Sequence, residues 1–96
     1  MRMLVITYAG ADARLVDRTL DAAGVPGWTR IGGAHGHGLD GPREGTRAWP
    51  GEVTVWFTVV PDERAGPVSD ALRDAAGTLP AAEGLHVAVL PTATFF

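Results

Sequence analysis

Two histidines separated by one residue stand in the most glycine-rich part of this chain. His35 and His37 lie within residues 32–51, a stretch that holds seven of the 13 glycines. In an extended segment, side chains two positions apart point to the same side. Two neutral imidazoles so placed can bind zinc, copper or nickel, with Asp40 or a third chain completing the shell. The alternative is that both are polar loop residues, and His86, inside an apolar run, is expected to be a structural histidine.

Three arginines accompany this stretch. Arg43 and Arg47 lie four residues apart within it, and Arg30 precedes it. A guanidinium offers a planar fork that suits phosphate or carboxylate groups, so three of them converging at a subunit junction would form an anion site. The alternative is surface pairing with the acids that are close in sequence, Asp40, Glu44 and Glu52.

The glycines themselves follow a familiar spacing. Residues 36–41, GHGLDG, match G-x-G-x-x-G, but a dinucleotide fingerprint must lead into a helix, and here Pro42 and a predicted strand follow. The pattern therefore predicts turn glycines whose bare N–H groups can approach an anion, the candidates being Gly36, Gly38 and Gly41. Trp49, at the end of the stretch, either stacks on a ligand ring or packs under the loop or against a neighbouring subunit.

Composition bounds the function. The chain has 96 residues, a single domain over residues 1–96, with a net charge of -3 and a pI near 5.4. This charge argues against nucleic acid as the main partner. There is no apolar run near the 18 or so residues that a membrane-spanning helix needs, and no secretory signal pattern, so we expect no membrane insertion and a cytoplasmic location.

The residues that usually carry catalysis are scarce. The chain has no cysteine and no lysine, which removes thiolate and Schiff-base nucleophiles, and its one serine, Ser69, falls on a predicted helix. No pair of acids has a spacing that suggests a general acid and base. We therefore expect a protein that is not an enzyme.

The elements that must position these residues follow from hydrophobic periodicity. Strands are expected at residues 3–8, 28–31, 52–60 and 85–90. A first helix follows Asp12 as its N-cap and ends at Gly24, and a second opens after Pro61. Pro67 is expected in the first turn of that second helix or at a late start. Residues 32–51 become a long hairpin connection.

This order predicts an α+β fold of the ferredoxin-like βαββαβ type. It has a four-stranded antiparallel sheet with both helices on one face. The bare sheet face would carry apolar side chains, including either Trp56 or Phe57, which are unsuited to open water. Self-association through the sheet, closed by cyclic symmetry, is the simplest remedy.

Residues 28–63, WTRIGGAHGHGLDGPREGTRAWPGEVTVWFTVVPDE, resemble the centre of the small PII-like proteins, relatives of the nitrogen regulatory PII signal transducers. The resemblance implies a trimer whose sheets face inward, with a cleft between subunits that binds adenine nucleotides such as ATP, ADP or AMP. It also implies that the loop between the second and third strands engages a partner protein. PII proteins carry basic residues between the second helix and the last strand, whereas residues 77–84 here, GTLPAAEG, have none.

The resemblance therefore implies a non-catalytic regulator that binds a small anionic ligand between subunits. Arg43 and Arg47 would supply charge, the three candidate glycines would supply backbone access, and Trp49 would act as a hinge or wall. Ligand binding would order residues 32–51 and change the affinity for a partner. The alternative is a divalent-metal-binding trimer similar to the CutA relatives of PII, with His35 and His37 as its first ligands.

Overall fold

The protein is described here by a computed structural model that covers residues 1–38, 41–43 and 52–96. Its elements are β1 (Arg2–Gly10), α1 (Arg14–Ala22), β2 (Thr29–Ala34), β3 (Gly36–Gly38), β4 (Gly41–Arg43), β5 (Glu52–Val60), α2 (Asp62–Ala76) and β6 (Gly84–Pro91). Neither described helix has the length and apolar character to cross a membrane.

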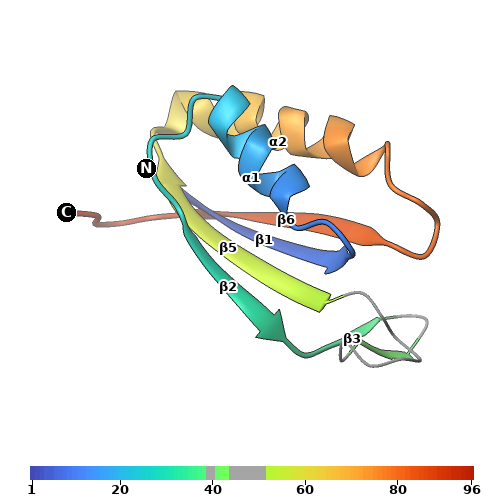
Figure 1. Ribbon diagram of the computed structural model, residues 1–96. Coiled ribbons are helices and arrows are strands. Elements are labelled where there is room, and N and C mark those ends of the chain that lie inside the picture. The colour runs from blue at the N-terminus through green and yellow to red at the C-terminus, as the bar shows by residue number, and fades with distance from the viewer. Residues whose placement is uncertain (39–40, 44–51) are drawn as a thin grey trace.

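One four-stranded sheet organises the chain. Its strand order is β2-β5-β1-β6, each neighbouring pair is antiparallel, and both helices cover the same face (Figure 1). The ferredoxin-like prediction is confirmed. The hairpin connection predicted over residues 32–51 includes strand structure that was not predicted, because β2 extends to Ala34 and β3 pairs with β4 in a second, two-stranded sheet.

The alternation of side chains along β5 separates the two faces of the sheet. Trp56 is fully buried against the helices, as are its same-face neighbours Thr54, Thr58 and Val60. Pairing with β1 places Leu4, Ile6 and Tyr8 on that face as well, opposite Thr58, Trp56 and Thr54 respectively. The predicted alternation is confirmed, and the core lies between this face and the apolar sides of α1 and α2.

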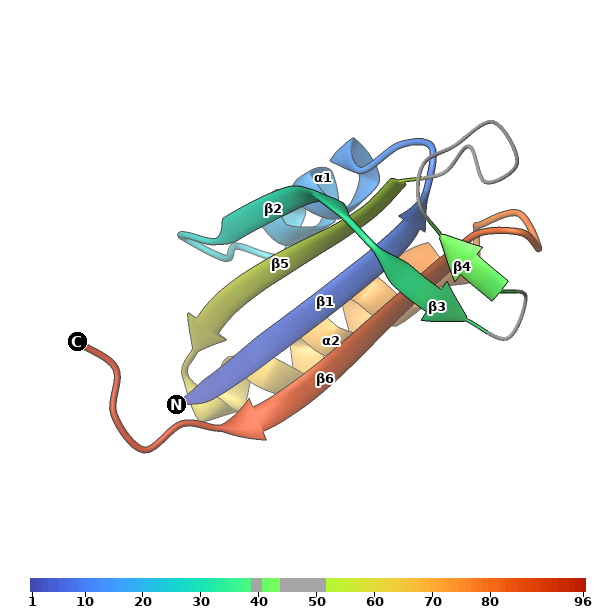
Figure 2. The same cartoon turned by 90° about the horizontal axis from the view of Figure 1, so that it is seen from below.

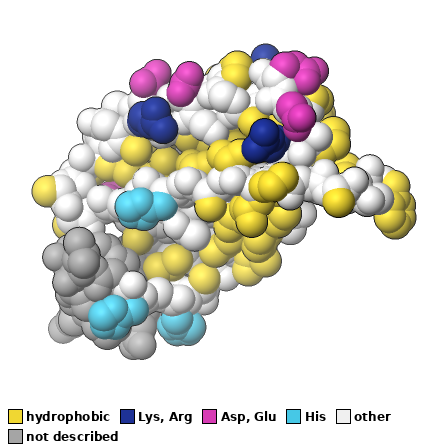
Figure 3. All heavy atoms as spheres, turned by 180° about the vertical axis from the view of Figure 1, so that it is seen from behind, with side chains coloured by type: hydrophobic (Ala, Val, Ile, Leu, Met, Phe, Trp, Pro, Cys, Tyr) yellow, Lys and Arg dark blue, Asp and Glu magenta, His cyan; other side chains and the backbone are white. Residues whose placement is uncertain are grey.

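Within the described chain, the other face of the sheet is covered only at one end, by the β3–β4 pair. Figure 2 shows this open face, with the helices behind the sheet, and Figure 3 shows hydrophobic side chains spread across it. Met3, Val5 and Phe57 are only partly buried there, and Ile31 is 51% exposed. A hollow of about 670 Å³ lies at one end, against Trp28 and Phe95. The expected apolar open face is therefore present.

A β-bulge extends β2 beyond its predicted end at Ile31. Ile31 pairs with Val55 and Ala34 pairs with Val53, so β2 has one residue more than β5 over this interval. Gly33 adopts a φ of 68°, a conformation that a residue without Cβ takes at little steric cost. The glycines that suggested a loop instead allow a bent strand.

The ends of α1 illustrate one correct and one wrong prediction. Gly24 has a φ of 76° and follows the C-cap, and Val25 N–H donates to the Leu20 carbonyl at 3.0 Å, as the Gly24 prediction requires. Asp12, by contrast, is not the N-cap. That position is Ala13, and the Asp12 carboxylate accepts from the Arg14 backbone N–H at 3.2 Å as part of a turn that precedes the helix.

Pro67 lies inside α2, beyond its first turn, so the expectation for this residue is wrong. Its ring removes the N–H that would bond to the carbonyl of Glu63. Both residues are exposed, so water can satisfy that carbonyl, and α2 continues to Ala76.

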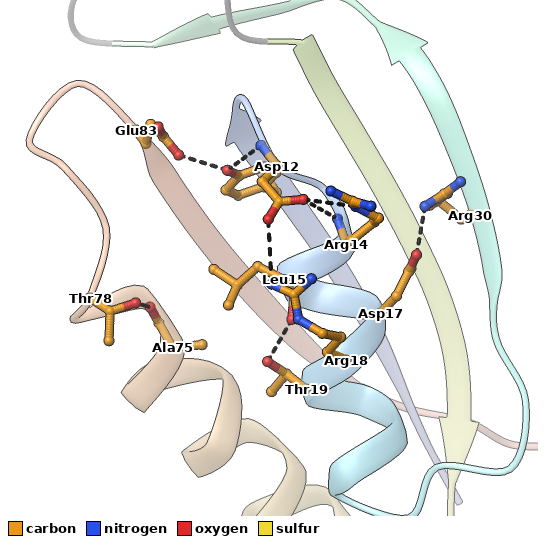
Figure 4. Close-up of polar contacts among 11 residues, drawn as sticks. Asp12, Arg14, Leu15, Asp17, Arg18, Thr19, Arg30, Ala75, Thr78 and Glu83 are labelled. Atoms are coloured by element: carbon orange, nitrogen blue, oxygen red, sulfur yellow. Dashed lines mark hydrogen bonds and ion pairs between the residues drawn. The ribbon is translucent and has the colours of Figure 1, made fainter.

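A buried indole ties α1 to the sheet. The Trp56 Nε1–H donates to Asp17 Oδ1 at 2.9 Å, and the Arg30 guanidinium donates to Asp17 Oδ2 at 2.6 Å. Figure 4 shows the Arg30 contact crossing from β2 to α1. One carboxylate thus joins a helix to two strands.

We predict that Asp17→Ala lowers the free energy of unfolding by about 1–3 kcal/mol, because it leaves the buried indole N–H without its acceptor. Chemical denaturation followed by tryptophan fluorescence measures this. The control is Asp21→Ala, an exposed acid on the same helix, which should change stability by less than about 0.5 kcal/mol. Equal effects from the two variants would contradict the assigned role of Asp17.

Candidate functional site

A cavity of about 530 Å³ opens on the uncovered face of the sheet, at the end where β2 leads into β3. Its lining includes all three histidines of the chain, His35, His37 and His86, together with Tyr8 and Glu83. Figure 3 shows histidine side chains at the end of the apolar face. The remaining lining is mostly aliphatic or glycine, so the polar groups are few and concentrated.

The bend after β2 explains how His35 and His37 reach this place. Beyond the bulge at Gly33, the chain crosses to the helix-free side of the sheet, where the β3–β4 pair lies (Figures 1 and 2). Val53 is only 9% exposed although it is on the open face. A Cβ added to Gly36 would lie 3.4 Å from Cγ2 of Val53. β3 therefore packs over the end of β5 and forms one wall of the cavity.

His86 reaches the same cavity from β6. It pairs with Thr7 of β1, while its neighbour Leu85 pairs with Tyr8 and is buried under the helices. Alternation therefore places His86 on the open face, and its side chain is exposed. His86 is therefore on the surface, no hydrogen bond to its imidazole is observed among the described residues, and its expected structural role stays a prediction.

The opposite wall is fixed by a tyrosine–carboxylate hydrogen bond. The Tyr8 hydroxyl donates to Glu83 Oε1 at 2.6 Å and accepts from the Asp12 backbone N–H at 3.1 Å. The Tyr8 ring is 1% exposed and meets Trp56 edge-on, with centroids 6.5 Å apart. Burial, followed by the bond to Glu83, raises the pKa of Tyr8 above its ordinary value.

The absence of a side chain at Gly10 makes room for this bond. A Cβ placed there would lie within 3.0 Å of Glu83 Oε1 and of the Tyr8 hydroxyl, closer than real contacts allow. On the helix side, Asp12 holds the turn between β1 and α1. Partial desolvation raises the pKa of Asp12, but hydrogen bonds from Arg14 and Arg18 outweigh it and leave the pKa below its ordinary value.

The residues predicted for anion binding are distributed over several places. Gly36 lines the cavity, whereas Gly38 and Gly41 face each other at the end of the β3–β4 pair. The backbone of Arg43 pairs with that of Gly36, the residue between His35 and His37. Three further candidates, Asp40, Arg47 and Trp49, lie outside the described residues.

Arg30 is not at the cavity. It pairs with Trp56 in the sheet, so it projects to the helix side, where it forms the ion pair with Asp17. The convergence of Arg30 with Arg43 and Arg47 therefore stays a prediction, and it would require Arg30 to leave Asp17.

The structure does not support the predicted metal site. Among residues 1–38, 41–43 and 52–96, no group of three or more histidine and carboxylate side chains is arranged to hold a metal ion. Although three histidines line one cavity, His35 and His37 reach it from the segment that leads into β3 and His86 reaches it from β6, and they do not form such a group. The CutA-like alternative consequently has no support in the described geometry.

Comparison with known proteins identifies the fold. The sequence matches no protein-family model and no curated protein sequence. Solved structures of CPII, a nitrogen regulatory PII-like protein from Thiomonas intermedia K12, do match. One, bound to ADP, AMP and bicarbonate, has 25% identity and a TM-score of 0.70 over 93% of this chain and 84% of its own. Another, bound to ADP and bicarbonate, has 26% identity and a TM-score of 0.69 over the same shares.

An apo structure of the same CPII has 21% identity and a TM-score of 0.64, over 93% of this chain and 87% of its own. The resemblance to PII-like proteins that the sequence suggested is thus confirmed by structures that span most of both chains. The described sheet and helices match the PII-like form of the ferredoxin-like fold.

We predict that Gly10→Ala lowers the free energy of unfolding by about 1–3 kcal/mol, because the added methyl group must displace the Tyr8–Glu83 pair. Thermal or chemical denaturation measures the change. Gly27→Ala is the matched control, since nothing lies within 4 Å of a Cβ at that position. A Gly10 variant as stable as the Gly27 variant would show that the pair is not held as described.

We also predict that Tyr8 ionises at a pH above 10.0. It is the only tyrosine, so the absorbance of tyrosinate reports on it alone. Because the folded-state pKa is raised, the stabilising contribution is complete below the ordinary value and is lost as pH rises through the raised one. In Glu83→Gln the midpoint should move back toward 10.0. An unshifted midpoint in the unmodified protein would contradict the burial and bonding of this hydroxyl.

Proposed function

We propose that this chain, whose fold is that of the PII-like proteins, is a non-catalytic regulatory protein that binds an adenine nucleotide or a similar small anion. The observation that carries the proposal is the histidine-lined cavity where β2 leads into β3, in a fold whose CPII relatives are seen with ADP, AMP and bicarbonate. At about 530 Å³, this cavity lies within the range of small-molecule sites.

The uncovered sheet face supports a homotrimer. Partly buried Val5, Phe57 and Val59 and exposed Ile31 form an apolar surface on one side of a thin two-layer domain. In a closed ring with sheets facing inward, neighbouring subunits would cover this surface. The cavity, at one end of the same face, would then lie at or near a subunit junction, where a second chain completes its wall.

Anion recognition would come from the glycine-rich stretch. Arg43 and Arg47 would supply positive charge, and Gly36, Gly38 and Gly41 would expose backbone N–H groups to the ligand. Trp49 would form a hinge or a wall, and Arg30 would join only if it exchanged Asp17 for the ligand. The position of β4, which brings the Arg43 backbone beside Gly36 at the cavity, supports this assignment.

Signalling would follow from linked equilibria. A ligand that contacts residues 32–51 favours the conformations of that stretch in which the contacts form, and a partner protein that prefers the same conformations then binds more tightly. The partner and the cytoplasmic location stay predictions from the sequence. We assign the cavity to binding alone, in keeping with a sequence that has no cysteine, no lysine and one serine.

We predict that ADP or AMP raises the melting temperature of a trimeric protein. Ligand at 100 times its dissociation constant adds about 2.7 kcal/mol to the free energy of unfolding. The double variant Arg43→Ala with Arg47→Ala should bind at least about tenfold more weakly, because it removes two charge-assisted donors. Calorimetric titration gives the affinities, and sedimentation gives the mass.

The control removes two arginine charges elsewhere, by Arg18→Ala with Arg73→Ala, both on exposed helix surfaces. If both double variants bind equally, the arginines of the stretch are not the anion ligands. If no adenine nucleotide stabilises the unmodified protein, the proposed function is wrong.

A further inference from the structure

All three histidines of this chain line one cavity, and they belong to two segments that are distant in the sequence. His35 and His37 flank Gly36 at the start of β3, and His86 projects from β6 on the far side. Each side chain is exposed, so each can exchange a proton with solvent. No histidine is used elsewhere in the fold, since the chain has only these three.

The other charged groups at the cavity are few. Among the residues that the structure describes, Glu83 is the only carboxylate in the lining, and its Oε1 is already bonded to the Tyr8 hydroxyl, which is neutral at physiological pH. No arginine belongs to the described lining. From β4, Arg43 approaches through its backbone pairing with Gly36. The segment that precedes β6, residues 77–84, contains no basic residue.

The charge of the described cavity lining therefore depends on the histidines. When the imidazoles are neutral, the lining carries one formal charge, the negative charge of Glu83. Protonation of all three adds three positive charges and reverses the sign. Histidine is the side chain that proteins most often use as a pH-dependent charge.

We infer that the His35, His37 and His86 cavity is a proton-linked anion site, which binds an anionic ligand tightly when its imidazoles are protonated and weakly when they are neutral. The inference rests on the proposed function and adds regulation by pH to it. Protons and the anion bind cooperatively, so each raises the affinity for the other. The fraction of such a protein that is bound to the anion depends on both the anion concentration and the pH.

The test uses sulfate as the probe, because its charge is constant across the range in which imidazole titrates. Calorimetric titration of the full chain at pH 6 and pH 8 should show sulfate affinity falling by at least tenfold. The protonated fraction of one ordinary imidazole falls roughly 25-fold over this interval. In nuclear magnetic resonance spectra, sulfate should raise the titration midpoints of the histidine ring protons.

Two sets of variants locate the effect. His86→Gln, and His35→Gln with His37→Gln, should each reduce the pH dependence, and exposed positions such as these tolerate glutamine. Glu63→Gln, an exposed change on α2, removes one negative charge from the protein away from the cavity and should leave the pH dependence intact. Sulfate affinity that is independent of pH overturns the inference, and so does a pH dependence that all the histidine variants retain.

A parallel titration with ADP separates this inference from the proposed function. ADP binding that is equal at pH 6 and pH 8, and unaffected by the histidine variants, overturns the proton-linked site and leaves the nucleotide-binding proposal intact. Failure of ADP to bind at either pH overturns the proposed function and this inference with it. ADP binding that weakens at pH 8 through His86 supports both.

Discussion

The burial of Trp56 is the constraint on which the rest of this structure depends. An indole placed in the core must have its N–H bonded, and Asp17 provides the acceptor at 2.9 Å. This bond fixes which face of β5 is inside and which helix lies over it. Residues that pair across neighbouring strands share a face of the sheet. The orientation of β5 therefore also determines which side chains of β1 and β6 face the helices. His86 is on the open face as a consequence.

A second constraint acts where β2 leaves the sheet. The strand must bend toward the open face, and a bulge with Gly33 at positive φ bends it while Ala34 still pairs with β5. His35 and His37 are thereby carried over the end of β5, where β3 buries Val53. The cavity is the space left between this crossing segment and the wall that Tyr8 and Glu83 hold in place.

The sequence was sufficient for the elements whose periodicity is uninterrupted. β5 begins and ends as predicted, because its alternation runs without a break from Glu52 to Val60. It was insufficient where one residue satisfies two patterns. Glycines 32 and 33 suit a loop and a bulged strand equally. A proline usually begins or ends a helix, yet α2 continues past Pro67 because the carbonyl that loses its N–H donor, that of Glu63, is at an exposed position.

The cavity was harder to predict than the fold, since its residues meet only through strand register. Tyr8 and Glu83 are 75 positions apart, and no local pattern shows that they bond. From the sequence, His35 and His37 were weighed as metal ligands or polar loop residues and His86 was expected to be structural, because a sequence shows spacing and not direction. Only the fold shows that the segment leading into β3 and the distant β6 place all three histidines around one cavity. The proton-linked site inferred above depends on that shared lining, which no spacing along the chain could have shown.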